Sequence, residues 1–512
     1  TFEIDAHGDL VSVLQPGWSA LQTFAYDSSH RMTHKQDPRG YLTTYVYGEE
    51  GRLLRAELPP RPIYDPDTGE WRTEQEIHYF APGDTSYPVV NDLDPGTPVN
   101  PTTALPDPDE IVDRVSYGNV SYTGTTNRWG STLTATDAQS RTVRYERDER
   151  DLVTRITTPE GNCAEFTYDD NQNLLSMSRM GAAQCALPAD QRDPNQVQTT
   201  RYTYETRFNQ VKTATDPLSR TTTYFYDYEL GQGEAGLPVR IEYPQVENEW
   251  GQVVTPTETF EYNGWGQLTR AVDVRGVATC YSYTQGTADE AAGGSNPLFA
   301  SGVTPVPGHL TQIAEDCGGS LERVTVMKEF DAAGNPQVII EPAGDFGPRR
   351  SLLTYDARNR LTSITDPLGV VTRFAYDDDD NLIQTVEDAT GRPLTTTYTY
   401  DAKNLLLGTR WEGEGQAIAV AFGYDLNRRL TMEQDGLGNV TRHFYDNTGQ
   451  RTRTLDPLGN ATAYTYDGDS RLETTTDPRG SVTRIVYDDL GRAAQIIADV
   501  GGLNLTTAFT YD

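Results

Sequence analysis

The sequence predicts an all-β protein: a long antiparallel meander of β-hairpins that curls into a hollow spiral shell, or cocoon. Three observations lead to this fold class. The dipeptide Tyr-Asp recurs every 21 or 24 residues in the C-terminal third. Strands of alternating character separate tight turns of the form Asp-Pro-x-Gly. Only 36% of the 512 residues are hydrophobic, which is lean for a chain with a thick core.

The repeat is most regular near the C-terminus, where successive units differ in length by three residues. In the longer units the second strand gains two residues, which keeps its Tyr on the same face. The third extra residue lies in the first half of the unit, where it requires a bulge or a looser turn. In the N-terminal part the repeat is less regular, although the Tyr-Asp dipeptide is kept at Tyr26-Asp27 and Tyr168-Asp169. The regular dipeptides begin at Tyr355, Tyr376, Tyr400, Tyr424, Tyr445, Tyr466, Tyr487 and Tyr511.

Each unit contains two turns. The first is Asp366-Pro367-Leu368-Gly369 in the clearest unit: Asp caps the turn, Pro presets φ, and Gly is tolerated in the fourth position. The second turn follows the Tyr-Asp dipeptide, as after Tyr355-Asp356 and Tyr376-Asp377. The first kind of turn recurs at Asp456 to Gly459 and at Asp477 to Gly480.

The segments between the turns read as strands. Thr372, Phe374 and Tyr376 alternate with residues of other character, and a period of two is typical of a strand. We therefore expect Tyr466 and Tyr487 to lie on one face of the sheet. Open twisted sheets rarely exceed about ten strands without curling, so a meander of some tens of strands predicts a shell rather than a sandwich.

Four segments interrupt the repeat, and they are expected to be insertions in one shell that covers residues 1–512. They span about 57–115, 179–199, 229–258 and 284–328. The first holds eleven of the thirty prolines and is predicted to be an extended, loop-rich excursion.

Four cysteines allow three disulfide pairings. The sequential pairing, Cys163 with Cys185 and Cys280 with Cys317, is favoured because in both pairs a cysteine in a repeat strand is followed by one in an insertion. Free buried thiols are the alternative. No CxxC pair is present, which argues against a zinc ribbon.

Charge and hydropathy exclude several classes of partner. The formal net charge is -33, and such a chain repels nucleic acid and anionic membrane surfaces. No apolar run approaches the roughly 20 residues of a transmembrane helix, so direct membrane insertion by this segment is not expected. The sequence has no initiator Met and no signal peptide, and we expect it to be a section of a longer polypeptide that carries the targeting signal elsewhere.

No catalytic, cofactor-binding or metal site is predicted. The acidic run from Asp377 to Asp380 falls on a repeat turn and is interpreted as solvated. Asp65, Asp67 and Glu76 have spacing that suggests a calcium loop, but Glu70 occupies the position where such a loop needs Gly. The six histidines lie in no HExxH or GxSxG setting.

The unit Y-D-x-x-G/N-R-L, then D-P-x-G, then T-x-Y-x-Y-D resembles the RHS/YD-repeat family. Residues 355–377 and 445–488 carry the resemblance best, and it extends over nearly the whole chain apart from the insertions. The family includes bacterial Rhs polymorphic toxins, the B and C components of insecticidal toxin complexes, and animal teneurins. The resemblance implies a hollow β-sheet cocoon and, in the bacterial toxins, an enclosed C-terminal toxic domain released by self-cleavage.

The family's self-cleavage element is not predicted in this chain. Asp456 to Gly459 and Asp477 to Gly480 superficially resemble its paired D-P-x-G turns. The spacing between them is one residue short, Ser481 stands where the element has Leu, and a further repeat follows. Both are interpreted as ordinary turns.

The resemblance leads to a first functional hypothesis, a structural shell that shields a C-terminal toxic domain until delivery. The expected partners are then the rest of the same polypeptide (further repeats, plug domains and the toxin) and components of a secretion machinery. A secreted or cell-surface location follows. The alternative is an extracellular adhesion or glycan-binding module, and a β-rich hydrolase is least favoured.

The first and last strands of the meander are expected to leave unpaired edges. Residues 506–511, the last strand expected, contain no Pro or Lys that would block pairing. We therefore expect further repeats or plug domains of the same polypeptide to cover both ends, and the isolated chain to self-associate.

Overall fold

The structure is a computed structural model of the whole chain. It describes residues 1–14, 21–48, 51, 53–81, 89–91, 94–99, 110–117, 120–127, 131–137, 139–248, 250–287, 298, 300, 303–304, 306–344 and 347–511. In this part of the chain, 39 strands form one sheet, and three further strand pairs stand apart from it. None of the described helices is long and apolar enough to cross a membrane.

The sheet is an antiparallel meander in which each main-sheet strand pairs with the main-sheet strands before and after it in the chain. The strands up to residue 344 form what we call the first coil, and those of residues 347–511 form the second coil.

The main-sheet strands of the first coil are β1 (Phe2–Ile4), β2 (Leu10–Val13), β3 (Gln22–Tyr26), β4 (Met32–Gln36), β5 (Leu42–Tyr47), β6 (Leu53–Glu57), β9 (Ile77–Ala81), β12 (Glu110–Tyr117), β13 (Val120–Asn127), β14 (Thr132–Thr136), β15 (Thr142–Arg147), β16 (Val153–Thr157), β17 (Cys163–Tyr168), β18 (Leu174–Met180), β19 (Val197–Tyr204), β20 (Val211–Thr215), β21 (Thr221–Tyr226), β22 (Pro238–Glu242), β25 (Thr257–Tyr262), β26 (Leu268–Val272), β27 (Ala278–Gln285), β28 (Pro307–Glu315), β29 (Arg323–Phe330) and β30 (Pro336–Gly344).

The strands of the second coil are β31 (Gly347–Tyr355), β32 (Leu361–Thr365), β33 (Val371–Tyr376), β34 (Leu382–Glu387), β35 (Leu394–Tyr400), β36 (Leu406–Gly413), β37 (Gln416–Tyr424), β38 (Leu430–Gln434), β39 (Val440–Tyr445), β40 (Arg451–Leu455), β41 (Ala461–Tyr466), β42 (Leu472–Thr476), β43 (Val482–Tyr487), β44 (Ala493–Ala498) and β45 (Leu505–Ala508).

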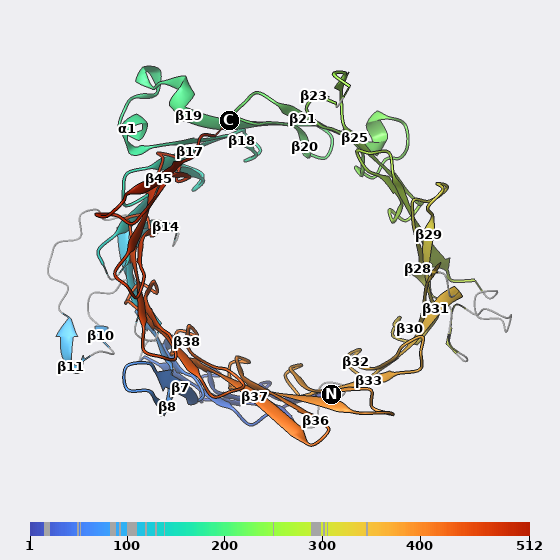
Figure 1. Cartoon of the computed structure of the whole chain (residues 1–512), viewed down its shortest axis with the longest axis horizontal. Helices are drawn as coiled ribbons and strands as arrows, with labels where there is room; N and C mark the ends of the chain where they lie inside the picture. Colours follow the sequence, from blue (N-terminus) through green and yellow to red (C-terminus); the bar gives the residue numbers. More distant parts are fainter. Residues whose placement is uncertain are drawn as a thin grey trace.

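The ribbon of strands curves into a ring whose middle is free of backbone (Figure 1). The first coil runs almost the whole way round. The second coil then continues past the start, so that the strands up to β45 lie along the same side of the ring as β7, β8 and β14 (Figure 1). The all-β spiral expected from the sequence is therefore present.

The repeat turns share one geometry. In the turn at 366–370, the Asp366 carboxylate accepts the N–H groups of Leu368 and Val370 at 2.9 and 2.8 Å. Gly369 has φ 86°, a left-handed conformation that favours glycine over other residues. The turns after Tyr-Asp repeat this arrangement, with glycine in the left-handed position of some, as at Gly449 with φ 89°, and another residue in others, as at Asn359 with φ 63°. Asp and Asn tolerate that conformation better than most residues.

The ladder bulges next to the repeat tyrosines of 21-residue and 24-residue units alike. Tyr376 pairs with Leu382 while its neighbour Ala375 pairs with Gln384, which leaves one extra residue between the two partners. A bulge is thus not restricted to the 24-residue units, where the sequence suggested it.

The register places the repeat tyrosines on one face. Tyr464 pairs with Thr475, and Thr475 pairs with Thr483. Because side chains alternate along a strand, Tyr466 and Tyr487 share that face, which confirms the expectation.

The tyrosine-bearing face points into the ring. The segment of α1 (Ala182–Cys185) and the hairpin of β7 (Arg61–Asp65) and β8 (Glu70–Glu74) both lie outside the ring (Figure 1). Both attach to residues that alternate with repeat tyrosines, Cys163 and Gly423. The opposite, tyrosine-bearing face therefore lines the inside.

The four interrupted segments contain more sheet than expected. The strands β9 and β12 within 57–115, β22 within 229–258 and β28 within 284–328 all continue the meander. They were missed because they lack the Tyr-Asp and Asp-Pro-x-Gly signals. Residues 82–88, 92–93, 100–109 and 288–297 of these segments lie outside the described part.

The remaining elements of these segments are short. The segment 179–199 contains α1 and two 3-10 turns, η1 (Ala189–Gln191) and η2 (Pro194–Gln196), and η3 (Asp227–Glu229) opens the next segment. The isolated strand pairs are β7 with β8, β10 (Val89–Asn91) with β11 (Asp94–Val99), and β23 (Val246–Glu247) with β24 (Val253–Val254).

Candidate functional site

The two coils meet along a seam made by turns. The ribbon has two edges: we call the edge with the Asp-Pro-x-Gly turns and their equivalents the DP edge, and the edge with the turns after Tyr-Asp the YD edge. In the contacts described below, the DP edge of the first coil meets the YD edge of the second. Partners across the seam are 307 to 367 residues apart in sequence.

The seam begins at Arg39, in the DP turn 37–41. Its guanidinium donates to the Oδ1 of Asn404 at 2.9 Å and to the carbonyl of Asp401 at 3.4 Å. It also pairs with the carboxylates of Asp377 and Asp379. The acidic run at 377–380, interpreted from sequence as a solvated turn, therefore forms part of the seam.

Further along, the DP turn at 137–141 faces two YD turns. The Gln139 amide donates to the Asp446 carboxylate at 2.8 Å. Arg141 donates to the Oε1 of Gln450 at 3.3 Å and to the carbonyl of Asp467 at 3.4 Å.

Asp469 is the most heavily bonded residue of the next contact. Its carboxylate accepts from the Thr158 hydroxyl at 3.0 Å, the Glu160 N–H at 3.0 Å and the Asn162 amide at 2.7 Å. The Glu160 carboxylate pairs in turn with Arg471 at 2.6 Å. One YD turn of the second coil is therefore held by three residues of a single DP turn.

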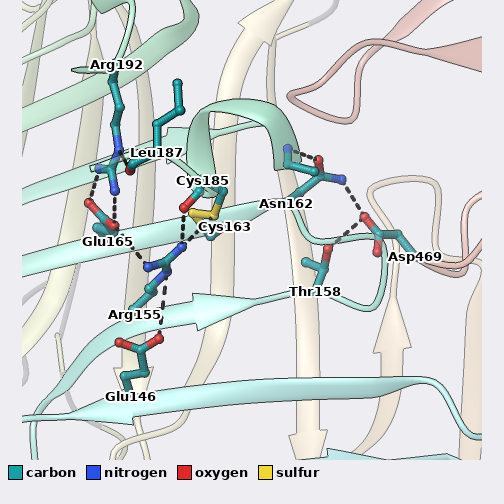
Figure 2. Close-up of a disulfide and its surroundings, with 11 residues drawn as sticks. Glu146, Arg155, Thr158, Asn162, Cys163, Glu165, Cys185, Leu187, Arg192 and Asp469 are labelled. Atoms are coloured by element: carbon teal, nitrogen blue, oxygen red, sulfur yellow. Dashed lines mark hydrogen bonds and ion pairs between the residues drawn. A yellow bond between two sulfur atoms is a disulfide. The ribbon is translucent and has the colours of Figure 1, made fainter. Parts of the chain in front are cut away.

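A disulfide fixes the segment beside this contact. Cys163 is bonded to Cys185, which anchors residues 181–196 to the outer face of the wall (Figure 2). The Oδ1 of Asn162 accepts the N–H of Ala182 at 3.0 Å, while its amide reaches Asp469. Asn162 thus links the disulfide-anchored segment to the second coil. The second bond joins Cys280 to Cys317.

Charged side chains hold the other end of that segment. Arg192 donates to both oxygens of Glu165, at 2.6 and 2.9 Å. Arg155 donates to the Cys185 carbonyl at 2.6 Å and lies 3.8 Å from Glu165 (Figure 2). The Arg192 hydrogen bonds outweigh partial burial and hold the pKa of Glu165 below its usual value.

The hairpin β7–β8 clamps the second coil from outside. The Thr431 hydroxyl donates to the Tyr64 carbonyl at 2.9 Å. A Cβ on Gly423 would come within 2.5 Å of the Tyr64 Cβ, so the close approach of the two strands requires glycine there.

The charged residue at the centre of this clamp is Arg61, which is fully buried. It donates to the carboxylate of Asp401 at 3.3 Å, to the carbonyl of Asp425 at 2.7 Å and to the carbonyl of Leu426. Asp401 is itself 2% exposed. Buried charges are tolerated when they are paired and hydrogen-bonded.

Glu76 extends the buried charge network. Its carboxylate pairs with His78 and, at 3.5 Å, with Lys403 of the second coil. Burial opposes ionisation, but His78, Lys403 and Arg61 together hold the pKa of Glu76 below its usual value. Burial likewise lowers the pKa of Lys403, although Glu76 opposes this.

Asp65 and Glu76, which the sequence spacing grouped in a calcium-loop pattern, make separate contacts in the structure. The Asp65 carboxylate accepts N–H bonds of its own turn from Asp67 and Thr68, and Glu76 belongs to the seam. Among the residues that the structure describes, no group of three or more His, Cys, Asp or Glu side chains is placed to hold a metal ion.

The sequence-identified repeat residues form a ladder that supports the seam. The Tyr376 hydroxyl donates to the Leu361 carbonyl at 2.9 Å. Arg360 pairs with Asp356 at 2.8 Å, and its guanidinium carbon lies 4.9 Å from the Tyr376 ring centroid. Each unit is thereby tied to the next. The same Tyr hydroxyl bond occurs at Tyr400, Tyr424, Tyr445, Tyr466 and Tyr487, and the same Arg contact at Tyr445 and Tyr487.

Sequence reasoning identified Tyr and Asp but gave no role to this Arg, which lies four residues after the Asp in several units. Its regular occurrence at Arg360, Arg429, Arg471 and Arg492 was the available signal. The seam residues had no such signal, because Arg39, Gln139 and Glu160 differ in type although they hold the same turn position.

Glu205 stands where other units have the turn Asp, and it is buried. Its buried carboxylate accepts from the Tyr228 hydroxyl and from the N–H groups of Arg207, Phe208 and Gln210. Burial alone would raise its pKa, but these donors lower the pKa of Glu205 to about 2.

Because the folded pKa is below the unfolded one, the stabilisation by Glu205 is present above pH 4.5 and is lost as pH falls from 4.5 towards 2. We expect Glu205→Gln to lower the unfolding free energy by about 3 kcal/mol near neutral pH and by far less at about pH 2. Urea unfolding across this range tests it. An equal loss at both pH values would contradict the assignment.

Two stretches of the second coil match the model of a known repeat. Residues 355–393 and 445–482 match the model of the RHS repeat. No curated protein matches the chain. Among solved structures, a crystal structure of TcdB2-TccC3 without the hypervariable C-terminal region is similar at 14% identity and TM-score 0.47, covering 96% of this chain and 27% of that one.

A second similar structure is the Tc holotoxin pore of Photorhabdus luminescens with a mutated TccC3, at 14% identity and TM-score 0.46, covering 95% of this chain and 26% of that one. A third, TcdB2-TccC3, has 12% identity and TM-score 0.39 and covers 99% and 33%. The chain thus spans about a quarter to a third of the length of these proteins.

Proposed function

We propose, from the match of two stretches of the chain to the RHS repeat and from the ring that its strands form, that it is a section of a structural shell. In this proposal the shell encloses a C-terminal toxic domain of the same polypeptide and shields it until delivery. The observation that carries the proposal is the seam. Two coils of one ribbon are held edge to edge by the buried Arg61–Asp401 pair and by hydrogen bonds such as that from Asn162 to Asp469, around a middle free of backbone.

The chemistry of the wall supports containment rather than catalysis. The polar groups of the seam are engaged in holding turns together, as Asp469 and Arg61 show. In this proposal the wall has no reaction of its own, and any cleavage or toxin activity resides elsewhere in the polypeptide. Delivery then places the protein outside the producing cell, with components of a secretion machinery as partners.

Limited proteolysis of the full polypeptide tests the proposal. We expect its C-terminal domain to survive a protease that digests the same domain when it is produced alone. Replacing Arg61 with methionine opens the clamp and should expose the domain, whereas Arg72→Met in the same hairpin, whose side chain is 53% exposed, should not. Equal digestion of the enclosed and free domain would refute the proposal.

A second candidate function, glycan or cell-surface adhesion, is favoured by two exposed tryptophans, Trp250 and Trp265. Exposed aromatic rings stack on apolar and cationic ligand faces. They lie in different turns, one beyond β23 and the other after β25. Binding of the chain to a glycan array that is lost in Trp250→Ala and Trp265→Ala would support adhesion over containment.

A further inference from the structure

A guanidinium lies beside one sulfur of the first disulfide. Arg155 donates to the Sγ of Cys185 at 3.1 Å and to the carbonyl of the same residue at 2.6 Å (Figure 2). Its two acidic neighbours are further away, Glu165 at 3.8 Å and Glu146 at 3.9 Å. The Glu165 carboxylate is also occupied by Arg192, which donates to both of its oxygens. The shortest contacts of the Arg155 charge are therefore with Cys185.

A cavity reaches the other cysteine of the same bond. It has a volume of about 310 Å³ and lies where residues 158–164 of the first coil meet the YD turns at 467–471 and 488–492. Cys163 lines this cavity, whereas Cys185 does not. The two cysteines are otherwise buried, at 5% and 4% exposure. A small molecule that enters the cavity therefore meets Cys163 first.

We propose that this bond is a thiol–disulfide exchange site for a small dithiol, with Cys163 as the sulfur that is attacked and Cys185 as the leaving group. A guanidinium stabilises a neighbouring thiolate, and a sulfur that forms a stable thiolate leaves faster. The contact with Arg155 makes Cys185 that sulfur. The cavity admits the nucleophile on the side of Cys163.

The exchange consists of two displacements. In the first, a thiolate of the dithiol attacks the Sγ of Cys163, the S–S bond breaks, and its electron pair leaves on the Sγ of Cys185 beside the Arg155 guanidinium. In the second, the other thiolate of the dithiol attacks its own sulfur that is bonded to Cys163. This step closes a cyclic disulfide and leaves Cys163 as a thiolate. The dithiol has then lost two electrons and two protons, and the two cysteines have gained them.

Opening the bond would release a segment that packs against the second coil. The Asn162 amide joins Asp469, while its Oδ1 accepts the N–H of Ala182. A Cβ on Gly181 would come within 2.2 Å of the Asp489 Cβ, so the segment also fits closely against the next YD turn. Disulfides persist outside cells and are reduced in the cytosol, so the two coils would be held less tightly in a reducing compartment. The exchange itself does not depend on the proposed function, because it involves no enclosed domain.

A monothiol probe identifies the sulfur that is attacked. 2-Mercaptoethanol forms a mixed disulfide that cannot cyclise, so brief treatment of the wild-type chain, followed by acid quenching and alkylation, marks the two cysteines differently. Peptide mapping should find the mercaptoethanol adduct on Cys163 and the alkyl group on Cys185. An adduct mainly on Cys185, or equal adducts on both cysteines, would overturn the proposal.

The rate of reduction by dithiothreitol tests the role of Arg155. We expect Arg155→Met to slow reduction of this bond about threefold or more, although losing the contact with the Cys185 carbonyl loosens the segment. Two variants serve as controls: Asn162→Ala loosens the segment without touching a sulfur, and Arg150→Met removes an arginine, 39% exposed, near the other end of β16. Neither should slow reduction. Unchanged or faster reduction of Arg155→Met, or equal slowing in the controls, would contradict the assignment. If Arg155→Met does not fold, the position of the adduct in the wild-type chain decides.

Discussion

Replacing Arg61 with methionine is expected to lower the free energy of unfolding by about 3–5 kcal/mol, the range for removing one partner of a buried charge pair. The substitution leaves the Asp401 carboxylate buried without its guanidinium, and it removes the donors to the carbonyls of Asp425 and Leu426. Methionine keeps most of the side-chain volume, so the loss reports charge and hydrogen bonding rather than a cavity. Urea unfolding monitored by fluorescence gives the value.

The matched control is Arg72→Met, from the same hairpin. Arg72 pairs with Asp65 at 2.9 Å but has a side chain that is 53% exposed, and such pairs contribute about 1 kcal/mol or less. Hydrogen exchange should show the Arg61→Met effect first in β7 and in the turns at 401–405 and 425–429. A loss of similar size in both variants would mean that the clamp does not depend on its buried charge.

Replacing both Cys163 and Cys185 with serine is expected to lower the free energy of unfolding by about 3 kcal/mol. The bond closes a loop with a sequence separation of 22 residues, and loops of that size contribute about 3 kcal/mol in the chain-entropy account. Because Asn162 joins the anchored segment to Asp469, we also expect faster hydrogen exchange in the turn at 467–471. Thermal melting and exchange measure the two effects.

The second disulfide provides the control. Removing Cys280 and Cys317 opens a loop with a sequence separation of 37 residues, so a global loss of comparable size is expected. The turn at 467–471 should keep its protection, since the seam contacts of Asp469 come from residues 158–162. Equal loosening of that turn in both double variants would contradict a local role for the Cys163–Cys185 bond.

Local chemistry made the repeat unit predictable. Asp366 and Gly369 specify a turn on their own, and the period of two from Thr372 to Tyr376 specifies a strand face. Motif-free strands such as β28 could not be recognised in the same way, because their pairing depends on neighbours in space. The acidic run at 377–380 was interpreted as solvated for the same reason, since its partner Arg39 lies more than 300 residues earlier.

The sequence allowed a spiral to be predicted. It did not allow a prediction of which turns of the two coils face each other. The number of strands requires a curled ribbon, yet nothing local to Gln139 indicates that it meets Asp446. The pitch is set by the sum of small twists over a whole coil, and the seam then selects one alignment through matched side chains. Glu160 with Arg471 is one such match.

The register of the seam is tested most directly by cross-linking across it. The described cysteines are all in disulfides, so the double variant Gln139→Cys/Asp446→Cys introduces the two thiols available for cross-linking. In the native pair the Gln139 amide nitrogen lies 2.8 Å from the Asp446 carboxylate. A bismaleimide of about 8 Å should join them efficiently in the folded chain. The control pair, Gln139→Cys with Arg479→Cys, places the second thiol on the opposite edge of the second coil, a strand length of about 18 Å away. The account predicts cross-linking of the first pair alone, and equal or absent cross-linking of the two pairs would contradict it.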